Sequence, residues 1–259
     1  FQNYWCKWSK SVVGSLVSLY NSLPSENKRP ILRSRPNIED ELYKFLGCDQ
    51  STGKVNNQQG ALCLGDMVLI KIALCDFFKT YVNLSEHDLN AYFNDSFKIA
   101  IDDIEKDIKP LGDVKALFSE LKDIGCEVAL FTSDVEYASE KAINILNLNE
   151  FFENKSNLFL CSDSPSQRRF EKPSGDALRY LADQVGLISE ASSGSDNSWK
   201  SKVLMVGDSK TDILSAKKAG VKSLFVESGL YDSKVLRLQN IYPDITAKNV
   251  VDDINVFMQ

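Results

Sequence analysis

Residues and patterns that carry chemistry in many proteins are scarce in this sequence. Histidine occurs once, at His87 in the segment SEHDL, where we expect a helix to begin. We interpret it as a solvated surface residue, and a single histidine argues against a histidine-based hydrolase. The six cysteines never form a C-x-x-C pair. They are expected to be buried free thiols in a reducing compartment rather than disulfides or zinc ligands.

Long apolar runs are also missing. The longest candidate, residues 67–74, is interrupted by Lys71 and falls short of the roughly 18 residues that a membrane span needs. The formal net charge is −6, and an acidic surface repels phosphate backbones and anionic lipid. We therefore expect a cytoplasmic monomer or homodimer with no nucleic-acid or membrane partner. A length of 259 residues suits one large domain, or a core domain with a smaller inserted domain.

The first part of the chain has the pattern of helices. Apolar side chains recur at spacings of three and four over residues 5–23. The segment 37–47 begins with Asn37 before acidic residues and stops at a glycine, and Ser85 precedes a further acidic helix start. Strand patterns are scarce up to Lys109. Residues 1–107 are therefore predicted to form a helical domain.

From Pro110 onward, short apolar runs alternate with amphipathic segments. Four runs are typical of strands: 126–132, 157–161, 202–207 and 221–227. The alternation predicts βαβ units, and hence an α/β fold with a doubly wound parallel sheet over residues 108–259. The first of these strands is expected to be buried on both faces. The serine-rich segment 189–202 is expected to be a polar loop without a packing role, and a last helix is expected over 247–258.

Polar residues gather where the predicted strands end. Thr132 and Ser133 follow the first strand, and Asp208 follows the third, with Asp212 one helical turn later. Lys172 precedes a proline and a predicted helix. Ligands of doubly wound sheets bind beyond the carboxyl ends of the strands. A hydroxyl and an ammonium group suit a phosphoryl group, and two carboxylates suit Mg²⁺, which takes oxygen ligands.

The order of these residues resembles a known family. Thr132, Lys172 with its proline, and the run GDSKTD are similar to the second, third and fourth motifs of the haloacid dehalogenase-like (HAD) superfamily. The segments LFSELKDIGCEVALFTSD and GDSKTDILSAKKAG resemble its phosphoglycolate phosphatase-like members. The preceding helices resemble the cap that this subfamily inserts after its first strand. The resemblance implies a HAD-like Rossmannoid core, residues 108–259, with an inserted helical cap domain, residues 1–107.

The first motif of that superfamily, D-x-D-x-T at the end of the first strand, is absent from the sequence. Asp49 and Thr52 in GCDQSTGK lack the second aspartate and a preceding strand. The opening FQNYWCKWSKSVV resembles the segment that follows the catalytic loop in one group of these phosphatases. We therefore expect one strand and its catalytic loop upstream of Phe1.

The resemblance implies a two-step hydrolysis through an aspartyl-phosphate. The nucleophile and the general acid–base would be two aspartates outside this sequence. Thr132 would hydrogen-bond the phosphoryl group, with the N–H of Ser133 as a further donor, and Lys172 would neutralise charge. Asp208 would ligate Mg²⁺, and Asp212 would support the metal through water or orient its neighbours.

Several of these residues also have a structural interpretation. Alone, the two aspartates would be a helix cap and a first-turn acid, and Lys172 would be a solvated loop lysine; the ordered set favours function. Trp5 and Trp8 are interpreted as core of the helical domain. Arg33 and Arg35 could reach a substrate carboxylate, although a solvated loop is the safer interpretation.

The sequence thus favours a Mg²⁺-dependent phosphatase of small phosphorylated metabolites, with phosphoglycolate as the leading substrate through the family likeness. Two alternatives stay open. One is a phosphosugar mutase or pyrophosphatase on the same scaffold, and the other is a non-catalytic HAD-like binding protein without a nucleophile. The chain as written is expected to be inactive toward phosphate esters, because it lacks the nucleophilic aspartate.

Overall fold

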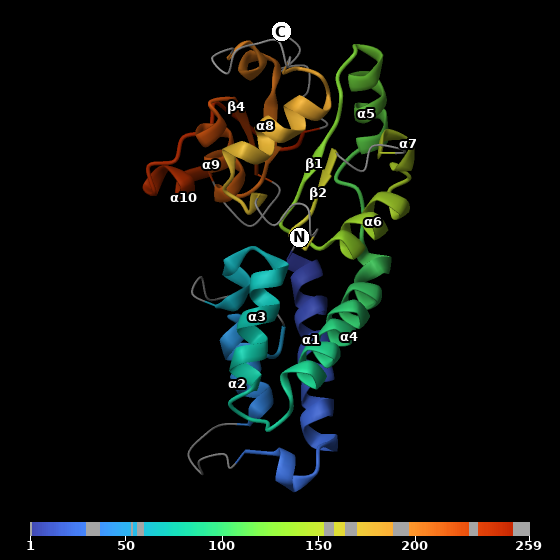
Figure 1. Ribbon diagram of the computed structural model, residues 1–259, viewed down its shortest axis with the longest axis vertical. Coiled ribbons are helices and arrows are strands. Elements are labelled where there is room, and N and C mark those ends of the chain that lie inside the picture. The colour runs from blue at the N-terminus through green and yellow to red at the C-terminus, as the bar shows by residue number, and fades with distance from the viewer. Residues whose placement is uncertain are drawn as a thin grey trace. The chain divides into compact units, whose positions relative to one another are not determined.

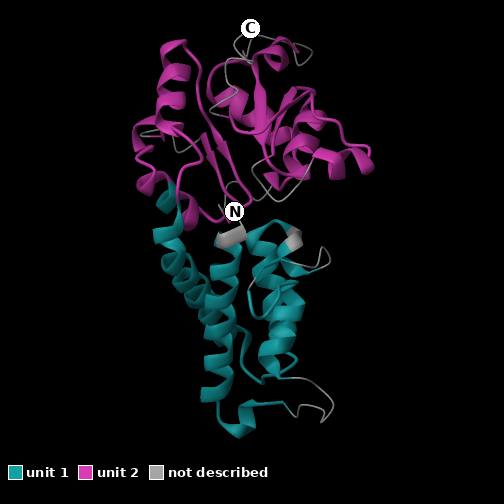
Figure 2. Cartoon of the chain, turned by 180° about the vertical axis from the view of Figure 1, so that it is seen from behind, with its two compact units in different colours: residues 1–108, 140–142 teal, residues 109–139, 143–259 magenta. Residues whose placement is uncertain are grey.

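The computed structural model consists of two compact units. Unit 1 comprises residues 1–108 with 140–142, and unit 2 comprises residues 109–139 with 143–259 (Figure 2). The residues that the structure describes are 2–29, 37–52, 54–55, 60–152, 158–163, 170–188, 197–227 and 233–250. Arg33, Arg35 and most of the last predicted helix lie outside these ranges.

Unit 1 is helical, as the sequence predicts. Its helices are α1 (Gln2–Ser22), α2 (Ile38–Leu46), α3 (Met67–Phe78) and α4 (Glu86–Ile104), with short 3-10 helices η1 (Ser25–Asn27), η2 (Ala61–Leu64) and η3 (Glu105–Asp107) (Figure 1). The predicted caps are confirmed: the Asn37 side chain accepts a hydrogen bond from the amide of Glu39, and the Ser85 side chain accepts one from the amide of Asp88. Gly47 ends α2 with φ at 80°, a conformation that glycine adopts without strain.

The core of unit 1 is built on aromatic residues of α1 and α4. Trp8 is fully buried. Its ring meets Trp5 edge-on, with 5.6 Å between ring centroids, and meets Phe97 edge-on at 5.0 Å. Such edge-to-face pairs are a favoured aromatic geometry. The interpretation as core is therefore confirmed for Trp8, whereas Trp5 is only partly buried and packs against it.

Unit 2 contains parallel strands alternating with helices, which confirms the α/β prediction. The strands β1 (Leu130–Phe131) and β2 (Phe159–Leu160) pair with each other, and β3 (Leu204–Gly207), β4 (Lys222–Val226) and β5 (Ile245–Ala247) form a second sheet in that order. The helices are α5 (Val114–Asp123), α6 (Glu136–Ile145), α7 (Asn149–Phe152), α8 (Gly175–Gln184), α9 (Lys210–Ala219) and α10 (Ser233–Leu238), with the 3-10 helix η6 (Ser198–Lys202) (Figure 1). Strand β5 and helices α7 and α10 were not expected from the sequence.

Helices α8 and α9 form the core of unit 2 with strand β3. Met205 of β3 packs in one cluster with Leu178 of α8 and Ala216 of α9. Trp199 of η6 completes this cluster and is only 2% exposed. The prediction that residues 189–202 have no packing role is therefore wrong at its end, because the tryptophan there covers the helix pair.

The other face of β3 is open in the described part of the chain. Leu204 and Val206 are 40% and 43% exposed, although both are apolar residues of a parallel strand. Strand β1 is only two residues long, and Leu130 and Phe131 are both partly exposed. The prediction that residues 126–132 form a strand buried on both faces is wrong, because among the described residues β1 has a neighbour only in β2.

The cysteines largely follow expectation. Four are buried free thiols: Cys6, Cys48, Cys75 and Cys161. Cys126 is exposed, because it precedes β1 where the predicted strand is not covered, so its predicted burial is wrong. The side chain of Cys63 lies outside the described residues. Among the helices that the structure describes, none is long and apolar enough to cross a membrane.

Candidate functional site

The principal cluster of predicted site residues lies where β3 ends and α9 begins. Ser209 caps α9, since its side chain accepts a hydrogen bond from the amide of Asp212. Asp212 in turn accepts hydrogen bonds at Oδ2 from the amide of Ser209 at 3.0 Å and from its hydroxyl at 2.7 Å. This reciprocal capping box holds the Asp212 carboxylate in the first turn of α9, where the residue is buried. The positive end of the helix dipole stabilises a carboxylate there.

Gly207 makes room for that carboxylate. A Cβ atom at position 207 would lie 2.3 Å from Cγ of Asp212, which is far inside van der Waals contact. A residue without a side chain is therefore needed where the strand ends, so that the carboxylate can pack against the backbone.

Lys172 joins this cluster from a distant part of the sequence. Its Nζ lies 2.6 Å from Oδ1 of Asp212, and the two side chains are only 10% and 4% exposed. Nζ also lies 4.9 Å from the centre of the Phe131 ring, so the ammonium group is placed between a carboxylate and an aromatic face. Such a buried pair needs both partners, since either charge alone would be desolvated without compensation.

Asp208 lies in the turn between β3 and α9. Burial raises the pKa of its carboxyl group, and the negative charge of Asp212 raises it further, while Lys172 lowers it by a smaller amount. A cation beside Asp208 would offset both effects. The local electrostatics therefore favour a positive ion at this carboxylate.

The donor set fits Mg²⁺. This ion takes one or two protein carboxylates and completes its shell with water and phosphate oxygens. The described residues contain no group of three or more histidine, cysteine or acidic side chains that could hold a metal ion by themselves. Both oxygens of Asp212 already accept from Lys172 and Ser209, so Asp208 is the carboxylate suited to direct ligation and Asp212 is suited to support.

Thr132 and Ser133 follow β1, as expected. The amide of Thr132 donates to the carbonyl of Leu160 at 2.8 Å and continues the pairing with β2. The Thr132 hydroxyl accepts a hydrogen bond from the amide of Asp134 at 3.1 Å, which orders the turn that contains Ser133. The described contacts connect this turn to Lys172 through Phe131, the residue before Thr132.

The structure therefore brings Lys172, Asp208 and Asp212 together, whereas no contact links Thr132 or Ser133 to them directly among the described interactions. The roles of all five residues stay predictions. Sequence reasoning missed Phe131. It placed Ser209 at the end of the strand but gave it no role, although Ser209 and Asp212 have the spacing of a capping box.

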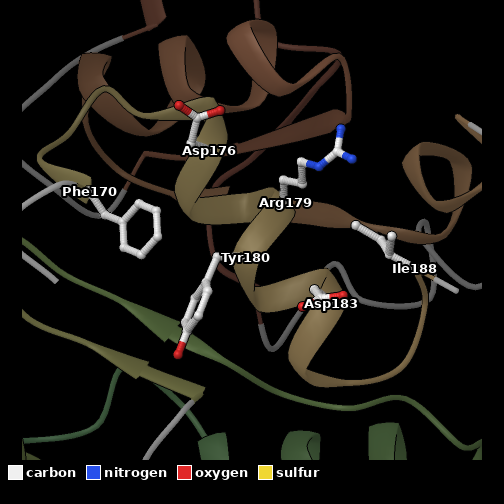
Figure 3. A pocket seen from close by; sticks show the side chains of 6 residues that line it. All are labelled: Phe170, Asp176, Arg179, Tyr180, Asp183 and Ile188. Atoms are coloured by element: carbon white, nitrogen blue, oxygen red, sulfur yellow. The ribbon is translucent and has the colours of Figure 1, made fainter. Parts of the chain in front are cut away.

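A separate hollow of about 510 Å³ lies on α8. It is lined by Phe170, Asp176, Arg179, Tyr180, Asp183 and Ile188. The four middle residues face one side of α8, and Figure 3 shows the Arg179 and Tyr180 side chains pointing apart rather than toward a common point. The three charged residues are exposed, and none of the predicted site residues lines the hollow. We interpret it as the solvated face of an amphipathic helix.

Known proteins with similar sequences are described as phosphatases. The chain is 30% identical to a phosphoglycolate phosphatase of Neisseria gonorrhoeae over 128 residues, which are 49% of this chain and 47% of that protein. It is 26% identical over 155 residues to a protein of Clostridium perfringens described as a pyrophosphatase, covering 60% and 62% of the two chains. The chain thus spans about half the length of the first of these relatives and less than two thirds of the second.

A solved structure and a family model extend the comparison over more of the chain. A Haemophilus somnus protein described as a phosphoglycolate phosphatase aligns with a TM-score of 0.58 at 17% identity, covering 98% of this chain and 91% of that one. At that identity the likeness shows the fold, which is an α/β HAD-like core with a helical cap. The family model for haloacid dehalogenase-like hydrolases matches residues 30–220, and the chain therefore belongs to the haloacid dehalogenase-like hydrolase family.

Proposed function

We propose that this chain is the cap and most of the core of a Mg²⁺-dependent phosphatase that hydrolyses small phosphorylated metabolites. The observation that carries the proposal is the cluster of Lys172, Asp208 and Asp212 beyond the carboxyl end of β3. A lysine and two carboxylates in that place suit a phosphoryl group and a hard cation. Residues 1–107 act as the cap domain, and residues 108–259 act as the catalytic core.

Each residue has a distinct role in the proposed reaction. Lys172 neutralises negative charge on the phosphoryl group, and the Thr132 hydroxyl donates a hydrogen bond to one of its oxygens. The amide of Ser133 is a further donor. Asp208 holds Mg²⁺, which supplies charge neutralisation and orientation of the phosphoryl oxygens when bound. Asp212 keeps Lys172 and the turn at Ser209 in place, so its role is support of the site.

The nucleophile of the proposed reaction belongs to a segment outside the 259 residues. The sequence has no D-x-D-x-T. Strand β3 is paired only with β4 and β1 only with β2 among the described residues, and Leu204 and Val206 are exposed on β3. A further parallel strand between β1 and β3 would pair with the unpaired edge of each strand, and its side chains would lie beside Leu204 and Val206. Its carboxyl end would bring an aspartate to the same edge as Asp208, where it could form an aspartyl-phosphate.

Phosphoglycolate is the first substrate that we propose, because the relative from Neisseria gonorrhoeae is a phosphoglycolate phosphatase. Pyrophosphate is the alternative within the same reaction class, since the Clostridium perfringens relative is described as a pyrophosphatase. A phosphosugar mutase would use the same core. A non-catalytic role in phosphate binding is the second candidate function for the 259 residues taken by themselves, since they contain no D-x-D-x-T motif.

The test uses the protein isolated from its natural source and the same natural-length protein produced with single substitutions. Intact mass, compared with the 29.0 kDa of this chain, shows whether further residues are present. Phosphate release is then measured from phosphoglycolate, pyrophosphate and a hexose phosphate, with Mg²⁺ and with a chelator. Asp208→Asn should abolish release, and the matched control Asp176→Asn, an exposed carboxylate on α8, should leave it unchanged.

Two results would overturn the catalytic proposal. The first is an absence of Mg²⁺-dependent phosphate release from all three compounds by the natural-length protein. The second is equal activity of Asp208→Asn and Asp176→Asn. Phosphate binding without turnover, measured by calorimetry, would establish the non-catalytic candidate instead.

A further inference from the structure

The segment that contains Lys172 is docked along α9 by a regular row of side chains. Residues 172–175 connect the stretch before α8 to its first turn. Three polar residues of α9 contact this segment, and they stand three positions apart along the helix: Asp212, Ser215 and Lys218. Residues three apart lie close together on the helix surface, so the segment binds along one side of α9.

The two contacts beyond Asp212 bind the backbone rather than a side chain. The amide of Ser174 donates a hydrogen bond to Oγ of Ser215 at 3.1 Å. Nζ of Lys218 donates one to the carbonyl oxygen of Pro173 at 2.8 Å. Both polar atoms of the Pro173–Ser174 peptide group, its carbonyl oxygen and its N–H, are therefore tied to α9. This limits how far the Lys172 backbone can move away from Asp212.

The surroundings of Ser215 orient its hydroxyl toward the amide of Ser174. Ser215 is fully buried, and its hydroxyl proton goes to the carbonyl of Thr211 at 2.8 Å. That bond orients the hydroxyl so that its lone pairs face the amide of Ser174. Ser174 is itself 9% exposed, so its amide would be left unpaired in a buried place if the Ser215 hydroxyl were lost.

Gly175 allows the same close approach. A Cβ atom at position 175 would lie 2.7 Å from the backbone nitrogen of Ala219 and 3.0 Å from the carbonyl oxygen of Lys218. The start of α8 therefore rests directly on the backbone of the last turn of α9. The segment is fixed at its far end by packing as well as by hydrogen bonds.

We infer that Ser215 and Lys218 are positioning residues for Lys172. They hold the backbone after Lys172 on α9 so that Nζ stays 2.6 Å from Asp212. Only the consequence for phosphoryl transfer rests on the proposed function. The positioning itself is a property of this chain and is measurable without substrate, metal or the nucleophile.

The test measures how often the Lys172 amine leaves its buried place. The folded chain is pulse-labelled with acetic anhydride, and acetylation of each lysine is quantified by peptide mass spectrometry, with Lys222 as the exposed internal reference. In Ser215→Ala we expect Lys172 to react about fivefold faster, which corresponds to the roughly 1 kcal/mol of one hydrogen bond. Lys218→Met should give a smaller increase because Lys218 is exposed, and Lys218→Arg, which can still donate to the carbonyl, should restore the wild-type rate.

Two controls separate positioning from general destabilisation. Ser223→Ala removes a buried serine hydroxyl of β4 that bonds Asp244, and Lys217→Met removes an exposed ammonium group next to Lys218. Neither residue is among those that contact the 172–175 segment, so both variants should label Lys172 at the wild-type rate. Hydrogen exchange at the Ser174 amide should speed up in Ser215→Ala and stay unchanged in both controls.

The inference is overturned for both residues if Lys172 labels equally fast in wild type, Ser215→Ala and Lys218→Met. It is also overturned if Ser223→Ala raises the rate as much as Ser215→Ala does. A rise in Ser215→Ala alone supports the serine and removes Lys218 from the inference. Because no turnover is measured, a failure here is distinct from a failure of the proposed phosphatase activity.

Discussion

Replacing Lys172 with methionine tests the buried ion pair most directly. The change removes the ammonium group and leaves an apolar chain of similar length beside Phe131. Asp212 then keeps its hydrogen bonds from Ser209 but loses its cation, and it is 3% exposed. Removing one partner of a buried pair costs about 3–5 kcal/mol. The remaining bonds to Ser209 place the expectation at the lower end, about 3 kcal/mol of unfolding free energy.

Urea unfolding gives the measurement, with the unfolding free energy extrapolated linearly to water. Because the chain has two compact units, the signal must be specific to unit 2, and hydrogen exchange of the α9 amides provides it. In thermal unfolding, about 3 kcal/mol corresponds to a decrease of roughly 6–12 °C for a unit of this size. Lys217→Met changes an exposed lysine of α9 and should alter the unfolding free energy by less than about 0.5 kcal/mol.

A double-mutant cycle decides whether the loss comes from the pair. Lys172→Met combined with Asp212→Asn should be more stable than the sum of the single losses predicts, because the unpaired carboxylate is then gone. Additive losses would refute the reasoning, as would a change in Lys172→Met no larger than that of Lys217→Met. Either result would mean that the 2.6 Å contact adds nothing to the stability of unit 2.

Three further predictions follow from particular side chains. Gly207→Ala would place Cβ 2.3 Å from Cγ of Asp212, so we expect it to lower the unfolding free energy by about 1–3 kcal/mol. It should also weaken the stabilisation that Mg²⁺ gives in thermal unfolding. An unchanged melting temperature would contradict the packing argument. Asp208 has a pKa that burial, and then Asp212, raise in the folded chain; its contribution to stability is therefore full below the unfolded pKa and is lost as the pH rises through the folded pKa. Asp208→Asn should thus be more stable than wild type at about pH 7 and lose this advantage below about pH 4, with calorimetry over that range as the assay and a constant difference as the contrary result. Trp8 is fully buried, and its indole nitrogen has no hydrogen-bond partner in the part of the chain that the structure describes. Trp8→Ala should therefore lower the unfolding free energy by about 3–5 kcal/mol, and Trp8→Phe by much less. Equal losses in the two variants would show that the indole N–H makes a hydrogen bond.

The sequence predicted those elements whose ends are set by contacts between residues close together in the chain. The side chains of Asn37 and Ser85 mark helix starts because their oxygens accept from amides within the same turn, and that geometry needs no distant residue. The run from Gly207 to Asp212 is readable for the same reason, since its capping box closes within one helical turn. The alternation of short apolar runs with amphipathic segments was enough to predict the α/β fold.

Burial and pairing that depend on residues far apart in the sequence could not be predicted from it. The run ending at Phe131 looks like a buried strand by its apolar content, yet its burial depends on which strands flank it. Trp199 lies in a serine-rich stretch and is buried only because α8 and α9 meet beneath it. The pairing of Lys172 with Asp212 joins residues 40 positions apart, so its distance could not be anticipated, although the family resemblance placed both residues at one site.

The open side of β3 has a consequence for the handling of this chain in solution. Among the described residues β3 pairs on one side only, with β4, and its apolar Leu204 and Val206 are exposed; such a strand edge is a template for pairing with another molecule. At high concentration the isolated chain should aggregate or form dimers through this edge, and a charged residue at position 206 should suppress it.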